Sequence, residues 1–198
     1  MQRITVITAY TISVAIILLT RCATWAQEGS GSSRSAPQRA ARPMTPDEFY
    51  QAFWKHLNKQ DSPYRKWGSL PGRNGIREGE APHGEFVRSY ANKTATDDPK
   101  GLPYGSILVT ENYEKDKKTV KDITVMYRSK GSDPQHGDWY WLDYRPDGGI
   151  ARTTAKAGNK AIAGKVASCI ECHSKAKGRD LVFGNDSVEV PEGTTNEK

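Results

Sequence analysis

Cysteine and histidine are scarce in this chain: its 198 residues include three cysteines and four histidines. Cys22 lies near the amino terminus, whereas Cys169 and Cys172 are close together near the carboxyl terminus. So few cysteines exclude the framework of several disulfides that small exported proteins commonly use. Three of the histidines stand singly in the sequence, which argues against the second ligand pair that a structural zinc site requires.

Long apolar runs are also lacking, with one exception. Arg3 precedes the apolar residues 4–19, and small residues follow around Ala26. The run is shorter than the ~20 apolar residues of a membrane-spanning helix. Residues 1–26 are therefore predicted to be a secretory signal peptide cleaved near Ala26, which makes the protein periplasmic or otherwise exported. An uncleaved anchor and a lipoprotein attached through Cys22 are the alternatives.

Charge of one sign is nowhere concentrated. The formal net charge is +6, and it falls to +4 when Arg3 and Arg21 are removed with the signal peptide. Basic and aromatic residues are not interleaved as in nucleic-acid-binding proteins, so no nucleic-acid partner is predicted. Ordinary solvation accounts for the small positive surplus, and docking to an acidic redox partner is the alternative.

The ends of the mature chain have little apolar sequence. Residues 27–43 are rich in Gly, Ser, Ala, Arg and Pro and are predicted to be a flexible linker. Residues 187–198 are predicted to be a disordered tail for the same reason. One folded domain, residues 44–186, lies between them.

The domain is predicted to open with a helix. Thr45 suits the N-cap, Pro46 the first helical position, and Glu48 completes a capping box. The apolar face of this helix is predicted to consist of Phe49, Ala52, Phe53 and His56.

In the middle of the chain, apolar and polar residues alternate as they do in antiparallel strands. Residues 107–113 and 123–127 are predicted to form a hairpin, and residues 138–144 a further strand. Residues 61–83 are rich in proline and glycine and are predicted to be loops. A last helix is predicted over residues 160–175. The fold class is therefore α+β: a mainly antiparallel β-sheet with an N-terminal helix and a C-terminal helix.

The last helix carries the motif Cys169-Ile170-Glu171-Cys172-His173, which is the C-x-x-C-H sequence of c-type haem attachment. On a helical turn, two thiols at this spacing reach the two vinyl groups of the porphyrin, and the adjacent histidine ligates the iron. We therefore predict one covalently bound haem c, with Cys169 and Cys172 binding the cofactor and His173 as the proximal iron ligand. A zinc site and a thioredoxin-like cysteine pair are the weaker alternatives.

A sixth iron ligand is harder to find in the sequence. The segment after His173 contains neither Met nor His, so such a ligand would have to come from upstream. Met126 shares a strand face with Thr124 and is expected to be a packing residue. Three upstream histidines are expected to be structural or exposed rather than ligands: His56, His83 and His136. The sequence therefore predicts an open distal position.

The chain resembles the cytochrome P-460 family, which includes the β-fold cytochromes c-prime. The resemblance covers roughly residues 81–185. It rests on these blocks in this order: 82–84, 87–88, 90–92, 104–113, 123–127, 137–141, 169–173 and 180–183.

The resemblance implies a C-terminal haem-binding helix, an exported homodimer and a site for small nitrogen species. Some members oxidise hydroxylamine and carry a lysine joined to the haem, and others bind nitric oxide or carbon monoxide. Lys93 is the candidate for the cross-link, Glu111 for a distal proton acceptor and Phe86 for an apolar cap. Glu111 as a solvated strand residue is the alternative. Three functions stay open: a hydroxylamine-oxidising oxidoreductase, a nitric-oxide-binding module and an electron-transfer carrier with a redox partner protein.

Overall fold

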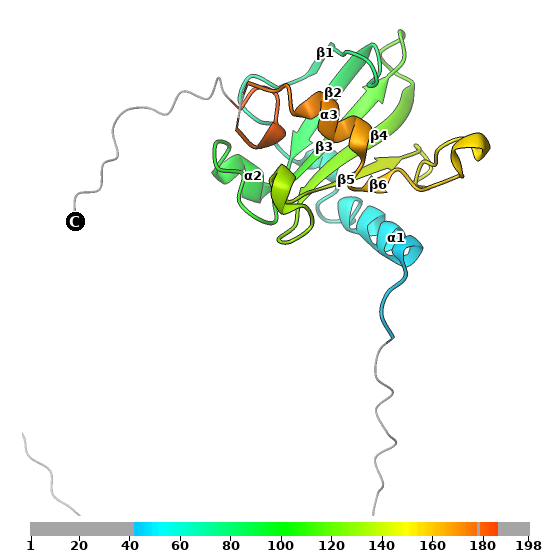
Figure 1. Cartoon of the computed structure of the whole chain (residues 1–198). Helices are drawn as coiled ribbons and strands as arrows, with labels where there is room; N and C mark the ends of the chain where they lie inside the picture. Colours follow the sequence, from blue (N-terminus) through cyan, green and yellow to red (C-terminus); the bar gives the residue numbers. More distant parts are fainter. Residues whose placement is uncertain (1–41, 178, 186–198) are drawn as a thin grey trace, which may run out of the picture. The chain divides into compact units, whose positions relative to one another are not determined.

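The alternating segments of the chain form one antiparallel sheet. The computed structural model describes residues 42–177 and 179–185, and within these ranges the sheet has six strands in sequence order. They are β1 (Ile76–Glu78), β2 (Phe86–Ala91), β3 (Ile107–Tyr113), β4 (Val120–Arg128), β5 (Trp139–Tyr144) and β6 (Ala163–Gly164). Helices pack against the sheet (Figure 1). The prediction of an α+β fold with a mainly antiparallel sheet is confirmed.

The predicted hairpin is formed by β3 and β4, and β4 starts earlier than predicted, at Val120. Apolar side chains lie opposite one another along it, with Val109 facing Val125. The Asp116 carboxylate closes the turn by accepting hydrogen bonds from the backbone N–H groups of Lys118 and Thr119, at 2.9 and 2.8 Å. Such local bonding is the usual reason for Asp in turns.

The first helix, α1 (Pro46–Leu57), begins at the predicted capping box. The Glu48 backbone N–H donates to Thr45 Oγ1 at 3.3 Å, and the Thr45 N–H donates to Glu48 Oε2 at 2.8 Å. The two bonds satisfy two of the free donors at the helix start, which stabilises a helix by about 1 kcal/mol.

The buried side of α1 differs in part from the prediction. Tyr50, Phe53 and Leu57 are buried, whereas Ala52 and His56 are exposed. The three buried side chains pack on one face of the sheet, which we call the α1 face. Its buried residues from the strands include Tyr90, Ile107, Val109, Ile123, Val125, Leu142 and Tyr144.

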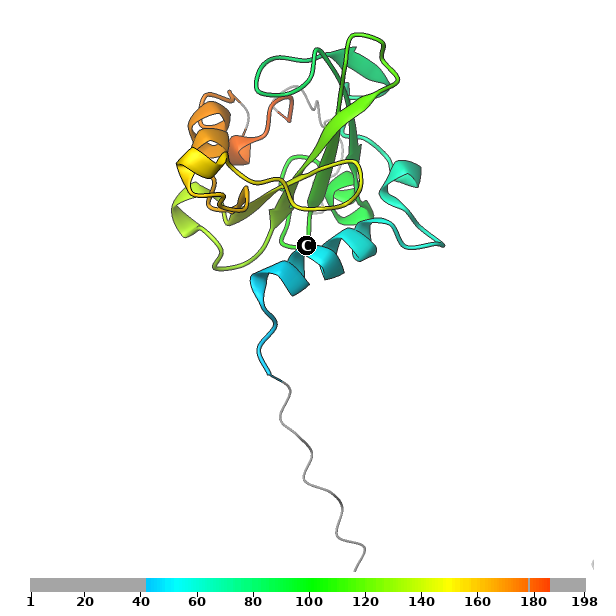
Figure 2. The same ribbon diagram turned by 90° about the vertical axis from the view of Figure 1, so that its right-hand side faces the viewer.

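Side chains alternate along each strand, so the opposite face of the sheet carries a different set. Met126, Trp139 and Trp141 are buried there and pack against Ile170 of α3 (Ala167–His173). We call this the α3 face. Helix α2 (Lys93–Asp97) contributes its buried Ala95 to the same cluster. Figure 2 shows α1 in cyan and α3 in orange, well separated around the sheet.

The helix that carries the motif is shorter than predicted. It spans Ala167–His173 rather than residues 160–175, because the preceding residues form the edge strand β6, in which Gly164 pairs with Trp141 of β5. Hydrogen bonding to the sheet edge decides the local structure there. Strands β1 and β2 were not predicted either, and β1 lies inside the predicted loop region 61–83.

The segments predicted to be terminal extensions are largely beyond what the structure describes. The signal peptide (1–26), the tail (187–198) and nearly all of the linker (27–43) lie outside the described residues. In the part that is described, no helix combines the length and the apolar character needed to cross a bilayer.

Candidate haem-binding site

The motif places two thiols on one short helix. Cys169 and Cys172 of α3 are both partly buried, and neither forms a disulfide. Residues three apart lie on the same side of a helix, so the two sulfur atoms face the same direction. Burial raises the pKa of the Cys169 thiol, with a smaller contribution from the charge of Asp143.

His173 ends α3, and its imidazole has a fixed orientation. Its Nδ1 lies 2.8 Å from the backbone carbonyl oxygen of Leu181. A carbonyl can only accept, so Nδ1 carries the proton and Nε2 keeps its lone pair for a metal. Burial lowers the pKa of His173, and the nearby His83 lowers it further, which favours the neutral ring.

The Leu181 carbonyl is held by an unusual piece of backbone. Asp180 and Leu181 both have positive φ angles, 61° and 60°. The Trp139 indole N–H donates to the Asp180 carbonyl at 2.7 Å, and Arg128 forms a salt bridge with the Asp180 carboxylate at 3.0 Å. Positive φ is costly for residues other than glycine, so these contacts fix a conformation that points the Leu181 oxygen at His173.

Three rings surround the His173 imidazole. Their centroids lie 4.7 Å away for Trp141, 5.3 Å for Phe183 and 6.3 Å for His83. Phe183 is 43% exposed although its ring lies beside that of His173. An exposed aromatic side chain beside an imidazole with a free ring nitrogen is suited to cover one part of a large, flat, apolar group.

The α3 face is apolar near α3 and polar farther along the strands. The polar residues of this face on β2 to β5 include Ser89, Thr110, Asn112, Asp122, Thr124 and Asp143. Several of them are joined by hydrogen bonds: Ser89 Oγ is bonded to Thr110 Oγ1, and Asn112 Nδ2 donates to Asp122 and to Thr124 Oγ1. A small polar ligand would therefore find hydrogen-bonding groups on this face.

Two buried polar atoms on the α3 face bear on whether the residues present fit a haem. Trp141 Nε1 and Asp143 Oδ1 have no hydrogen-bond partner among the described residues. Leaving such an atom unpaired costs about 1–3 kcal/mol, so this face is suited to a bound group with polar substituents. With the two thiols and the available Nε2 of His173, the residues fit a haem with thioether and axial imidazole attachment.

Asp143 is the carboxylate on this face with the most altered acidity. Burial and the charge of Asp122 raise its pKa to about 7. Sequence reasoning missed this residue, although its alternation with Trp139 and Trp141 along β5 would have placed it on their face of the sheet.

Glu111 lies on the opposite face, and its predicted role as a distal proton acceptor needs correction. It is in phase with Ile107 and Val109 on β3, so it points to the α1 face and is only 1% exposed. Its carboxylate accepts hydrogen bonds from the hydroxyls of Tyr64 at 2.8 Å and Tyr90 at 3.0 Å. The sheet separates it from α3, so it cannot serve a ligand bound beside His173.

The Glu111 carboxylate is ionised and fully partnered. It also accepts from the Tyr113 hydroxyl at 2.5 Å and from Arg65 Nε at 2.6 Å. Burial alone would raise the pKa of Glu111, but the bonds from Tyr113, Tyr64 and Arg65 outweigh burial and hold this pKa below its ordinary value. The alternative of a solvated glutamate is therefore also incorrect: Glu111 is a structural core residue.

Lys93 and Phe86 are also placed away from the motif. The Lys93 side chain is 86% exposed and forms a salt bridge with Asp97 at 2.7 Å within α2. Phe86 is in phase with Tyr90 of the α1 face, and the Lys117 ammonium lies 4.2 Å from its ring centroid. The structure supports neither the haem cross-link proposed for Lys93 nor the apolar cap proposed for Phe86.

Met126 and the remaining histidines are placed largely as predicted. Met126 is buried in the cluster on the α3 face. His56 lies on α1, on the far side of the sheet from the motif. His136 is bonded through Nδ1 to Asp133 Oδ2 at 2.8 Å. His83 is the exception, because it lies beside His173.

The fold and the site together define the class of protein: a haem-binding cytochrome of mainly β architecture. A family model described as Cytochrome P460 matches residues 62–184. The chain therefore belongs to the cytochrome P460 family, and the predicted resemblance is confirmed. The match begins after α1 and includes the whole sheet and the motif. No curated protein matches the chain significantly.

Proposed function

We propose that the protein is an exported mono-haem c-type cytochrome that binds or acts on small nitrogen species. Thioether bonds from Cys169 and Cys172 would hold the haem, and Nε2 of His173 would ligate its iron. The observation that carries this proposal is the hydrogen bond from His173 Nδ1 to the Leu181 carbonyl. It gives the imidazole the tautomer and orientation that an axial ligand needs, beside two unpaired thiols.

The polar part of the α3 face supports a small polar ligand such as nitric oxide or hydroxylamine. Thr110, Asn112 and Thr124 present hydroxyl and amide groups there. Binding of nitric oxide is the better supported version, because it requires no proton acceptor. Hydroxylamine oxidation requires one, and Glu111 is on the wrong face. Asp143 is the carboxylate that this version would need, and its pKa of about 7 suits a general base at neutral pH.

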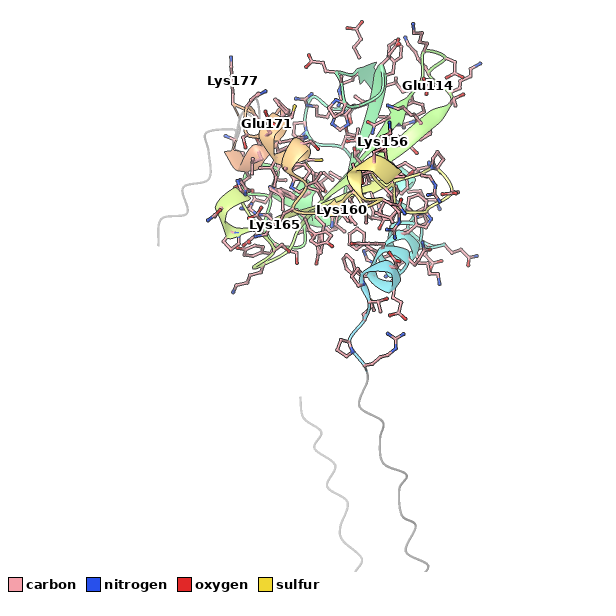
Figure 3. The ribbon with its side chains drawn as sticks, turned by 45° about the vertical axis from the view of Figure 1, so that its right-hand side comes forward. Glu114, Lys156, Lys160, Lys165, Glu171 and Lys177 are labelled. Atoms are coloured by element: carbon pink, nitrogen blue, oxygen red, sulfur yellow. The ribbon has the colours of Figure 1, made fainter. Side chains whose placement is uncertain are left out.

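The proposal includes export and two kinds of partner. The pattern of residues 1–26 supports a cleaved signal peptide and a periplasmic or other exported location, where haem c attachment takes place. Exposed lysines on the segments flanking α3, among them Lys156, Lys160, Lys165 and Lys177, support an acidic redox partner protein (Figure 3). The family resemblance supports a homodimer.

The first experiment tests attachment. The intact mass of the exported protein should equal the chain from Gln27 plus one haem, and the haem should stay attached after denaturation. Replacing both Cys169 and Cys172 by alanine should abolish covalent attachment. A wild-type mass without haem, or a zinc ion in its place, would contradict the proposal.

The second experiment tests the ligand. Optical spectra of the reduced holoprotein should change on addition of nitric oxide, and turnover of hydroxylamine should be measured with an artificial electron acceptor. A spectrum that ignores nitric oxide would favour the second candidate function, an electron-transfer cytochrome. The observation that favours this second candidate is the position of His83 beside His173.

A further inference from the structure

Two arginines lie close together at the β1 edge of the α3 face. Arg77 on β1 is paired with Val87 of β2, which is paired in turn with Asn112 of β3. Residues directly opposite each other in a sheet point to the same face, so Arg77 shares the α3 face with Asn112. The backbone carbonyl of Arg73 accepts a hydrogen bond from Arg77 Nη1 at 2.7 Å. Both arginine side chains are partly buried.

The two guanidinium groups have no acidic partner within the described ranges. No salt bridge there involves Arg73 or Arg77. Arg77 Nη2 donates instead to the hydroxyl of Ser89 on β2 at 3.2 Å, which is a neutral acceptor. Burial lowers the pKa of Arg77, and the charge of Arg73 lowers it further. Like charges held together away from water are unfavourable, so this pair of side chains is suited to an anion.

The haem motif lies over the same face of the sheet, nearest to β5. Cys169 packs against the buried cluster that contains Trp141 of β5. The His173 ring lies beside two other rings, 4.7 Å from that of Trp141 and 6.3 Å from that of His83. His83 is bonded through Nδ1 to Asn112 Oδ1 on β3, at 3.0 Å. The direction from the thiols to the imidazole therefore runs from β5 toward β3.

The same direction leads on to the two arginines. Strands lie about 4.8 Å apart, so the three spacings from β5 to β2, where Arg77 is bonded, span about 14 Å. Arg73 is connected to the motif by a separate contact: its guanidinium packs over Gly184, where an added Cβ would collide with Nη2. Gly184 follows Phe183, whose ring lies 5.3 Å from that of His173. Arg77 therefore lies beyond His173 as seen from the thiols, with Arg73 beside it.

We propose that Arg73 and Arg77 form a carboxylate-binding site, which the propionate groups of the haem occupy in the holoprotein. The inference rests on the proposed function, because it requires the haem that α3 would hold. A haem carries its vinyl groups on one edge and its propionates on the opposite edge, so attachment at Cys169 and Cys172 directs the propionates away from α3. A guanidinium binds a carboxylate through two parallel N–H groups. Arg77 uses only two of its five N–H donors in the bonds to Arg73 and Ser89.

The experiment uses the haem-loaded full chain and measures the resonance Raman band of the propionate side chains, which reports their hydrogen bonding. Arg73→Gln and Arg77→Gln should each shift this band. Each should also lower the haem reduction potential, measured at one fixed pH, because losing a positive charge beside an ionised carboxylate favours ferric iron. Arg77→Lys should keep most of the wild-type potential but still shift the band, since an ammonium keeps the charge and cannot make the paired bonds.

Arg88→Gln is the matched control. Arg88 is an exposed arginine on β2, and its guanidinium lies 5.2 Å from the ring centroid of Tyr90 on the α1 face. The substitution removes the same charge from the other side of the sheet, so the propionate band should stay in place. If Arg77→Gln does not load haem, Arg73→Gln alone carries the test. An unchanged band in the haem-loaded glutamine variants of Arg73 and Arg77 would overturn the inference.

Inorganic phosphate distinguishes a haem carboxylate from a free anion at the same site. The wild-type holoprotein should not bind phosphate there, because the propionates fill the site. Saturable phosphate binding to the wild type that Arg77→Gln abolishes would identify a site for a free anion and overturn the inference. Failure of the proposed function is distinguishable, because then the wild type itself carries no covalent haem.

Discussion

Arg128 and Asp180 form a two-point salt bridge, with Arg128 Nη1 3.1 Å from Asp180 Oδ2 and Nη2 3.0 Å from Oδ1. The bridge joins the end of β4 to the segment that follows the haem motif. Arg128 also donates to the carbonyl of Leu102 at 2.7 Å. One guanidinium thus ties the sheet to the residue next to Leu181, whose carbonyl orients His173. The geometry at His173 therefore depends on a side chain on another element.

Arg128→Lys should loosen this arrangement, because an ammonium cannot make the paired bonds of a guanidinium. We expect a loss of about 1–3 kcal/mol in the free energy of unfolding. We also expect a shift in the haem reduction potential, since the Leu181 bond would tune the basicity of His173, the proposed iron ligand. The matched control is Arg152→Lys, whose partner Asp47 is 70% exposed. An unchanged potential in Arg128→Lys would show that Leu181 is positioned without this salt bridge.

Glu111→Gln should destabilise the fold without changing the haem spectrum. The two carboxylate oxygens of Glu111 accept from four donors, and the substitution replaces one of these oxygens by an NH₂ group, which cannot accept. The expected cost is about 1–3 kcal/mol in the free energy of unfolding. Because the folded pKa of Glu111 lies below its ordinary value, its stabilising contribution is present above the unfolded pKa of about 4.3. That contribution is lost as the pH falls through the folded pKa.

Chemical denaturation of the two proteins at pH 7 and pH 3 measures this effect. The difference between wild type and Glu111→Gln should be large at pH 7 and smaller at pH 3. Glu114→Gln is the control, because Glu114 lies exposed in the turn of the same hairpin (Figure 3). A change in the haem spectrum of Glu111→Gln with unchanged stability would instead support the distal role first predicted for it.

Local patterns determined the parts of the fold that could be predicted. The capping box at Thr45 and the alternation of β3 and β4 depend on neighbours in the sequence. The fixed spacing of Cys169 and Cys172 is likewise a local signal. The place of Glu111 was also recoverable, because it is in phase with Val109, which belongs to the main core.

The parts that could not be predicted depend on contacts between distant segments. His83 and His173 carry no sequence pattern that pairs them, and only the order of the strands brings them together. The partner of His173 is a backbone carbonyl, which leaves no trace in residue type. The length of helix α3 was overestimated. Pairing of β6 with the edge of the sheet outweighs the helical tendency of the residues that precede α3.

Lys93→Ala should leave the haem unchanged, because the Lys93 ammonium is exposed and paired with Asp97. The mass of the holoprotein should fall only by the difference in side chains, and the absorption spectrum should match that of the wild type. Stability should change by less than about 1 kcal/mol, as is usual for an exposed pair. Lys100→Ala, another exposed lysine in this region, is the control. A spectral change specific to Lys93→Ala would show that the lysine reaches the haem.

Asp143→Asn should change how the free energy of unfolding depends on pH. The direction of the change should be opposite to that expected for Glu111→Gln. The folded pKa of Asp143 is raised to about 7, whereas the unfolded value is about 3.9. The folded state therefore holds this proton more tightly, and the charge of Asp143 destabilises the fold increasingly as the pH rises from about 4 to about 7. Between pH 5 and pH 8 the free energy of unfolding of the wild type should fall by about 1–2 kcal/mol relative to that of Asp143→Asn, after allowance for solvent screening.

Thermal unfolding of both proteins at pH 5, 6.5 and 8 measures this difference. Only the change with pH is diagnostic, because the asparagine amide introduces new donors of its own. Asp147→Asn provides the control: a backbone bond from Gly149 and a salt bridge with Arg145 lower the pKa of Asp147, so its contribution has the opposite sign. If the difference in stability between wild type and Asp143→Asn stays constant from pH 5 to pH 8, Asp143 does not titrate near neutrality. It would then be a poor candidate for the proton acceptor that hydroxylamine oxidation requires.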